Sequence, residues 1–336
     1  MFGAPAVLYL MSRQVGRTSD APDRYPLNRP EDQVTTSTPL FTYESHIDPR
    51  PVHAHTLVVT MGAFVDAGHV QRQFNDQVTD RLENHQLGHF DTDAIVDYRG
   101  NRPSMVFVHD HFTKYEPPQI TLHQATDRNG TPFLLLRGPE PDFRWEEIAD
   151  TIEQIIEDHS VSLTVMVQGI PMPTPHTRPL HITRWASKPS LIPDNRPMMG
   201  TMQISASFPA MLALRLGEAG HDVIGLSVNV PQYLAPGDYP DAAIAAIDAL
   251  KSTSALEVPA DSLRLVSGAV RAEIDRQVAE SAEAREMVAQ LEANYDRFTA
   301  EHRLLPGPDT TDLPSADEIA AEAEDFLRSL DDPPSE

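Results

Sequence analysis

The chain has 336 residues, of which 40% are hydrophobic and 23% are charged, and its formal net charge at pH 7 is −24. This composition is that of a folded globular protein, and the excess of acidic residues argues against binding to the phosphate backbone of nucleic acids. No cysteine is present, which excludes disulfide bonds, thiolate zinc sites and a thiol nucleophile.

Positive charge comes almost entirely from arginine, because the chain has only three lysines: Lys114, Lys188 and Lys251. This limits any mechanism that needs a phosphate-loop or Schiff-base lysine. A short apolar run near the N-terminus, APAVLYL, lacks a preceding basic region and is far shorter than the roughly 20 residues of a membrane span. We therefore expect no membrane-spanning segment and a cytoplasmic location.

The sequence pattern divides the chain into three parts. Residues 1–55 have little apolar periodicity and are expected to form an extended N-terminal arm. Residues 56–255 alternate strand-like and helix-like segments, which predicts an α/β core. Residues 256–336 are expected to form a helical, acidic C-terminal region, since 18 acidic residues stand against six arginines from Gly268 onward.

The first unit of the core is predicted to be a strand, a loop and a helix. The run TLVVTM at residues 56–61 predicts a buried strand, and apolar residues that recur every four positions from Val70 to Leu82 predict an amphipathic helix. The loop between them holds Gly62 and Asp66, where the N–H groups of a following helix can receive an anion. Its glycine spacing matches neither the dinucleotide fingerprint nor a phosphate loop.

Three further strands are predicted in the first half of the core. They cover residues 105–109, 120–124 and 133–136, and an Asn-Gly turn joins the last two as an antiparallel hairpin. The sheet is therefore expected to be mixed. A helix with an isoleucine-rich face follows at residues 145–159.

Asp97 precedes these strands in a segment that is dense in charge. We expect it to form a bidentate ion pair with Arg99 or Arg102, because a guanidinium matches the geometry of a carboxylate. The alternative is an arginine that stays free to hold an anionic ligand.

The stretch from residue 161 to residue 183 is the most informative part of the sequence. Its apolar start predicts a strand buried on both faces, and from Gln168 onward the chain is expected to leave the strand as a loop with four prolines. The prolines would present His176, Thr177 and Arg178 on a stiff backbone. Such a loop after a buried strand is where α/β proteins place their sites, although the prolines could instead only guide the chain across a sheet edge.

Three carboxylates at or near predicted strand ends are expected to converge with this loop: Asp66, Asp97 and Glu140. With His176 and Arg178 they would form an acid–base or ligand-holding cluster, whereas each carboxylate alone could cap a helix or pair with an arginine. The full set of candidate ligand-binding residues is Gly62, Asp66, Asp97, Arg102, Glu140, Gly169, His176, Thr177 and Arg178.

Helices dominate the rest of the prediction. A capped helix near residues 205–220, a strand at residues 223–230 and an alanine-rich helix to about Leu250 complete the core. A thin apolar stripe over some forty residues then predicts one long helix or a helical hairpin packed on a partner. A capping box at Ser315 predicts a last helix.

No catalytic or metal-binding motif of known mechanism occurs. The closest histidine group is His109-Asp110-His111, but alternate residues of a strand face opposite ways, so the two rings cannot share one ion without a bend. The H-E-x-x-H and G-x-S-x-G motifs are both missing, while a Ser–His–acid triad stays open because triads are defined in space. We expect no metal and no cofactor.

Several short motifs follow one another in a characteristic order: DYR at residues 97–99, GPEPD at 138–142, GIP at 169–171, PHTRP at 175–179 and VPQYL at 230–234. This succession resembles the PAC2 family, in particular its actinobacterial branch. The resemblance implies a three-layer α/β sandwich with a mixed sheet, similar to purine nucleoside phosphorylases, followed by helices, and a name shared with eukaryotic proteasome assembly chaperones. It carries over no catalytic residues.

Two functions are compatible with these observations. The first is an oligomeric scaffold or assembly factor that acts through protein–protein interfaces, with a homo-oligomer such as a trimer and with the C-terminal helices as a docking surface for a protein partner. The alternative is a binding protein or enzyme for a small anionic or nucleoside-like ligand in a pocket at the strand ends.

Overall fold

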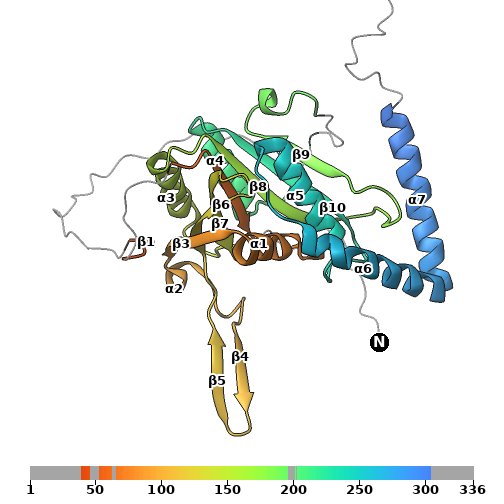
Figure 1. The fold of residues 1–336 in the computed structure, drawn as a ribbon, viewed down its shortest axis with the longest axis horizontal. Helices are drawn as coiled ribbons and strands as arrows, with labels where there is room; N and C mark the ends of the chain where they lie inside the picture. The colour runs from red at the N-terminus through yellow and green to blue at the C-terminus, as the bar shows by residue number, and fades with distance from the viewer. Residues whose placement is uncertain (1–38, 46–52, 63–65, 196–200, 202, 304–336) are drawn as a thin grey trace, which may run out of the picture. The chain divides into compact units, whose positions relative to one another are not determined.

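The computed structural model describes residues 39–45, 53–62, 66–195, 201 and 203–303. Its centre is a mixed sheet of eight strands (Figure 1). Their spatial order is β1 (Phe41–Tyr43), β3 (Glu83–Phe90), β6 (Thr121–Thr126), β7 (Pro132–Gly138), β2 (Thr56–Met61), β8 (Leu163–Met172), β10 (Val223–Pro231) and β9 (Ile182–Ala186). The four strands β7, β2, β8 and β10 run parallel, and every other neighbouring pair is antiparallel.

Helices cover both faces of this sheet. One face packs against η1 (Ala67–His69), α1 (Val70–Arg81), α5 (Pro240–Ser254) and the start of α6 (Asp261–Glu280). The other face packs against α2 (Thr92–Ile95), α3 (Trp145–Asp158) and α4 (Phe208–Glu218). Every residue of β2 and of β10 is buried, as expected for parallel strands covered on both faces. The predicted three-layer α/β sandwich with a mixed sheet is therefore confirmed.

Strand β8 is longer than the sequence predicts. It continues past Val167 as far as Met172, because β10 pairs with it in parallel register over its whole second half. Gly169 thus lies within the strand, and Pro171 pairs with Val230. The expected loop begins only at Pro173.

Two strands carry no apolar alternation and are missed by the sequence pattern. Strand β3 begins Glu-Asn-His-Gln, and these residues lie partly exposed and pair with β6, whereas β1 pairs only with the later part of β3. Strand β5 (His111–Glu116) pairs with β4 (Ser104–Val108) in a separate two-stranded hairpin that extends away from the main sheet (Figure 1). All residues of β4 and β5 are exposed.

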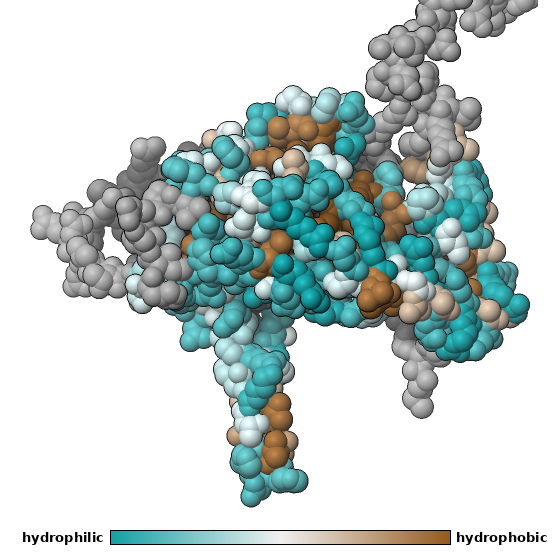
Figure 2. Space-filling model, in the orientation of Figure 1, coloured by the Kyte–Doolittle hydropathy of each residue, from teal (hydrophilic) through white to brown (hydrophobic). Residues whose placement is uncertain are grey.

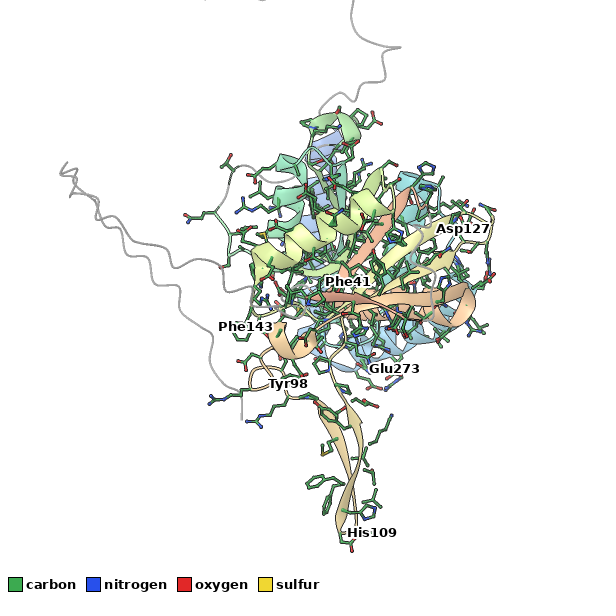
Figure 3. All side chains as sticks on the ribbon, turned by 90° about the vertical axis from the view of Figure 1, so that its left-hand side faces the viewer. Phe41, Tyr98, His109, Asp127, Phe143 and Glu273 are labelled. Atoms are coloured by element: carbon green, nitrogen blue, oxygen red, sulfur yellow. The ribbon has the colours of Figure 1, made fainter. Side chains whose placement is uncertain are left out.

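The predicted strand at residues 105–109 corresponds to β4, which ends at Val108, so His109 and His111 do not lie on one strand, contrary to the assumption that excluded a shared ion. His109 and Asp110 form the turn of the β4–β5 hairpin, and His109 has a φ of 54°. Figure 3 shows His109 at the tip of this hairpin and Tyr98 near its base.

The predicted apolar stripe after the core becomes two helices, α6 and α7 (Ala282–Arg303). They are separated at Ser281, whose backbone is extended with φ −116° and ψ 123°. Leu263 of α6 is buried in the core, while Val288 and Leu291 of α7 are also buried. The arm was predicted for residues 1–55, but its described part contains β1, which pairs with β3 at one edge of the main sheet. The rest of the predicted arm before residue 39 and the predicted helix at Ser315 lie outside the described residues. No helix of the described part is long and apolar enough to cross a membrane.

Candidate functional site

The loop after β8 is attached to the C-terminal helices through His176. The His176 side chain is only 4% exposed. The Tyr233 hydroxyl lies 2.8 Å from its backbone nitrogen and 2.6 Å from its Nδ1. The Asp275 carboxylate of α6 lies 3.1 Å from Nε2 and can only accept, so Nε2 carries an N–H and donates to it. The ring is therefore held from both sides.

Thr177 and Arg178 attach the same loop to α7. The Arg178 guanidinium donates two parallel hydrogen bonds to Asp296, at 2.8 and 2.7 Å, and a third to Glu292 at 3.1 Å. The Thr177 hydroxyl donates to Glu292 at 2.5 Å. The Arg178 guanidinium lowers the pKa of the Asp296 carboxyl. We call His176, Thr177 and Arg178, with their three carboxylate partners, the loop–helix clasp.

The contacts of the loop–helix clasp indicate the role of the predicted loop residues. The side chains of His176, Thr177 and Arg178 are all paired with carboxylates of α6 and α7. Burial raises the pKa of Tyr233, the other partner of His176. A guanidinium with three carboxylate contacts has little capacity left for an anionic ligand. The geometry therefore favours a structural role for this loop, as a support for α6 and α7.

Replacing Arg178 by Glu is expected to loosen α7 while the sheet stays folded. The new carboxylate would face Asp296 and Glu292, and like charges repel. Hydrogen exchange of the α7 amides should become several-fold faster, as measured by mass spectrometry. The matched control is Arg285→Glu on the same helix, since Arg285 is exposed and donates no side-chain hydrogen bond within the described residues. Equal exchange in both variants would contradict a supporting role for the clasp.

The carboxyl ends of β2 and β7 open into a second polar region, the strand-end pocket. It has a volume of about 360 Å³ and includes two of the predicted residues, Gly62 and Asp66. The Asp66 carboxylate accepts the backbone N–H groups of Gln71 and Arg72, at 2.9 and 3.2 Å, and so caps α1. Burial raises the pKa of Asp66.

The other predicted residues lie outside this pocket. The Glu140 carboxylate accepts the backbone N–H of Phe208 at 2.5 Å, at the start of α4. Burial raises the Glu140 pKa. Gly169 lies inside β8, where a Cβ would stand 2.2 Å from the carbonyl oxygen of Ala67. The structure thus brings Gly62 and Asp66 together, and it does not gather the remaining carboxylates around the loop.

The expected ion pair of Asp97 does not form within the described part of the chain. The Asp97 carboxylate instead accepts the backbone N–H of Arg99 at 2.9 Å. Its own backbone N–H donates to Asp142 at 2.6 Å. This exposed turn satisfies the carboxylate locally, so no guanidinium is needed, and Arg102 stays exposed at the base of the β4–β5 hairpin.

A larger, mostly apolar cavity of about 610 Å³ lies between α4 and the sheet. Its walls include Trp185, whose ring covers Gly225 so closely that a Cβ there would lie 1.9 Å from it. Gln71 reaches the cavity from the far side. Its amide donates to the carbonyls of Met61 and Val167, at 3.0 and 2.9 Å, where β2 and β8 separate.

Sequence reasoning missed Arg137, a charged residue of the strand-end pocket. Arg137 is a charged residue at the end of the apolar strand Phe-Leu-Leu-Leu, and the structure places it in the pocket wall with Asn75 and Asp76. A polar side chain that ends a buried run could have indicated this position.

One group of possible metal ligands occurs among the described residues. Atoms of Glu153, Glu157 and His221 lie within 4.8 Å of one another. His221 and Glu153 lie 3.7 Å apart, at ion-pair distance. The group is explained by surface pairing, and the expected absence of a metal stays a prediction.

The family model described as "PAC2 family" matches residues 61–278. The chain belongs to the PAC2 family. A Mycobacterium tuberculosis protein of unknown function is 35% identical, with a TM-score of 0.75, over 79% of this chain and 93% of that one.

More distant PAC2-like structures show the same fold. A Corynebacterium glutamicum protein of unknown function is 28% identical, with a TM-score of 0.71, over 76% of this chain and 97% of that one. A Mycobacterium tuberculosis protein described as a proteasome-assembly chaperone homologue is 22% identical, with a TM-score of 0.63, over 69% and 99%. Comparison with curated protein sequences gave no match.

Proposed function

We propose that this PAC2 protein is an assembly factor that works as a homo-oligomer through protein–protein interfaces. The description of one structural relative as a proteasome-assembly chaperone homologue supports this class of function. The observation that carries the proposal is the β4–β5 hairpin. The proposed function requires no catalytic reaction, and the cytoplasm is its proposed location.

The β4–β5 hairpin exposes large apolar side chains on a two-stranded element. Phe107 is 58% exposed and Phe112 is 69% exposed, with their ring centroids 4.9 Å apart. Met105 pairs with Tyr115 on the other side of a register shift from the phenylalanine pair, and Met105 is 50% exposed and Tyr115 49% exposed. Figure 2 shows brown atoms gathered along this hairpin.

Such a hairpin is poorly stable in water by itself. Two strands without a covering layer are marginal, and both outer edges leave backbone N–H and C=O groups without strand partners. A binding surface that covers the apolar face would remove both problems. We infer that the hairpin is an arm that docks on another protein chain.

Charge favours a second copy of this chain as the occupant. Arg99 and Arg102 are exposed at the base of the arm, and neither guanidinium meets a carboxylate within the described residues. The chain itself carries a net charge of −24, so its own surface is a suitable acidic receptor. An arm that binds a different surface of the next copy forms a heterologous contact, and three such contacts can close as a trimer.

The C-terminal helices offer a further surface for the assembled partner. Leu265 is 84% exposed and Val266 is 46% exposed on α6. We propose that this part of α6 contacts the protein being assembled, whereas the arm holds the copies together.

The double variant Phe107→Asp/Phe112→Asp tests the arm. The wild-type protein is expected to elute as an oligomer of the 37.2 kDa chain, and the variant as a monomer with an unchanged circular dichroism spectrum. The measurement is size-exclusion chromatography with light scattering. Phe143→Asp is the control, since Phe143 is 52% exposed but lies outside the hairpin. A monomeric wild type, or a variant of unchanged mass, would overturn the proposal.

A further inference from the structure

The strand-end pocket lies where ligands bind in many α/β proteins. It opens at the carboxyl ends of the parallel strands β2 and β7, beside α1. A crevice outside the carboxyl ends of parallel strands is a common binding position. Its volume of about 360 Å³ suits a small molecule, at the lower end of the usual range for ligand pockets.

Arg137 is the unusual group in this pocket. It lies on β7 directly between Thr60 of β2 and Thr121 of β6, and it is partly buried. Within the described residues its guanidinium donates to no protein oxygen, and every other arginine there without such a bond is exposed. A partly buried cation without an acceptor is costly, so a bound oxyanion would stabilise this site.

Asn75 supplies a second donor beside Arg137. Its Oδ1 accepts the Thr60 hydroxyl at 2.7 Å, which fixes the orientation of the amide. The amide N–H groups then have no acceptor among the described residues and can donate to a ligand. Arg137 and Asn75 together offer the forked donor set that a carboxylate or phosphate requires.

Two carboxylates complete the wall and add selectivity. Asp76 lies 3.6 Å from the Arg72 guanidinium, which leaves most of its oxygen capacity available. Burial raises the pKa of Asp76, whereas the charges of Arg72 and Arg137 oppose that rise. A ligand with only negative charge would meet repulsion from Asp76 and Asp66, so a hydroxyl or ammonium group must face them.

We propose that the strand-end pocket binds a small molecule that carries a carboxylate or phosphate group next to a hydroxyl or ammonium group. The oxyanion lies on Arg137 and Asn75, and the donor group lies on Asp76. No residue of the β4–β5 hairpin lines this pocket, so the site is independent of the proposed arm.

Calorimetric titration of the full chain tests this site with defined probes. Glycerol phosphate and serine each join an oxyanion to hydroxyl or ammonium donors, inorganic phosphate offers the oxyanion alone, and glycerol offers hydroxyls alone. We expect saturable binding of glycerol phosphate or serine, weaker binding of inorganic phosphate and none of glycerol. Saturation by a phosphate probe but not by serine would assign a phosphate group, and the reverse a carboxylate. No saturable binding of any oxyanion probe would overturn the proposal.

Variants show whether Arg137 and Asn75 carry the binding. Arg137→Gln is expected to weaken it by about tenfold or more, the usual worth of a charge-assisted hydrogen bond. Arg81→Gln removes the same charge from the exposed end of α1 and should bind like the wild type. Asn75→Asp keeps the acceptor for Thr60 and adds a carboxylate near Arg137, so it should remain folded and also lose binding. Retained affinity in Asn75→Asp would contradict the site even if Arg137→Gln fails to fold.

Discussion

Gly169→Ala is expected to lower the free energy of unfolding by about 3 kcal/mol, the upper part of the range for added atoms in a packed core. The new Cβ would stand 2.2 Å from the carbonyl oxygen of Ala67 and 2.9 Å from a methyl group of Val70. The first contact is with backbone, which cannot rotate away. The strand or η1 must therefore shift.

Urea unfolding measures this loss, with Gly268→Ala as the matched control. Gly268 lies inside α6, and a Cβ there would meet no atom within 4 Å. That variant should be more stable than the wild type by about 0.5 to 1 kcal/mol, because alanine favours the helix. If Gly169→Ala unfolds at the same urea concentration as the wild type, the close packing of η1 on β8 in this structure would be contradicted.

Acidification from pH 7 to pH 5 should destabilise the wild-type protein through His123. Burial, aided by the charges of Arg137 and His85, lowers the His123 pKa to about 4, whereas the unfolded chain titrates near 6.5. Between these values the unfolded state gains a proton that the folded state does not. This contribution to stability is therefore present above about pH 6.5 and is lost as the pH falls toward 4. The expected loss in the free energy of unfolding at pH 5 is about 1 to 2 kcal/mol, a figure that allows for partial access of solvent to His123.

His123→Gln should remove most of that pH dependence. Urea unfolding at pH 7 and pH 5 gives the comparison, and His111→Gln at the exposed end of the hairpin should behave like the wild type. The partly buried carboxyls Asp66 and Asp76 act in the opposite direction, because their raised pKa values favour proton uptake by the folded state as the pH falls. They are unchanged in His123→Gln, so the difference between the two proteins isolates the histidine. An equal pH dependence would show that His123 accepts a proton in the folded state.

The layers of the fold were predictable because strands that are buried on both faces appear in the sequence as continuous apolar runs. The runs at β2 and β10 are apolar at nearly every position, and both are buried throughout. The β6–β7 turn was equally clear. Asp127 accepts the backbone N–H groups of Asn129 and Thr131, and Gly130 has a φ of 82°.

The two strands that were missed, β3 and β5, lack such an apolar pattern. Strand β3 lies near a sheet edge and keeps polar side chains exposed, so no burial forces an alternating pattern. Strand β5 has no covering layer at all. In the hairpin the apolar residues face solvent, so its strands cannot be recognised from alternating buried and exposed positions.

The loop residues were found by composition, but their roles depended on distant partners. His176, Thr177 and Arg178 were singled out as a polar group on a proline-rich loop, and the structure pairs them with carboxylates on α6 and α7. Nothing local to the loop indicates which carboxylate it meets. Arg137 was overlooked for the converse reason, since its significance comes from an acceptor that it lacks among its neighbours in space.

The loop–helix clasp also sets an order for biosynthesis. Arg178 and its partner Asp296 are 118 positions apart in the chain. A ribosome that adds roughly 5 to 20 residues each second needs about 6 to 24 s to cover that distance. Over this interval the sheet can complete itself through β10 while Arg178 still lacks the carboxylates of α7, so the nascent chain presents an unpaired guanidinium that the finished protein pairs.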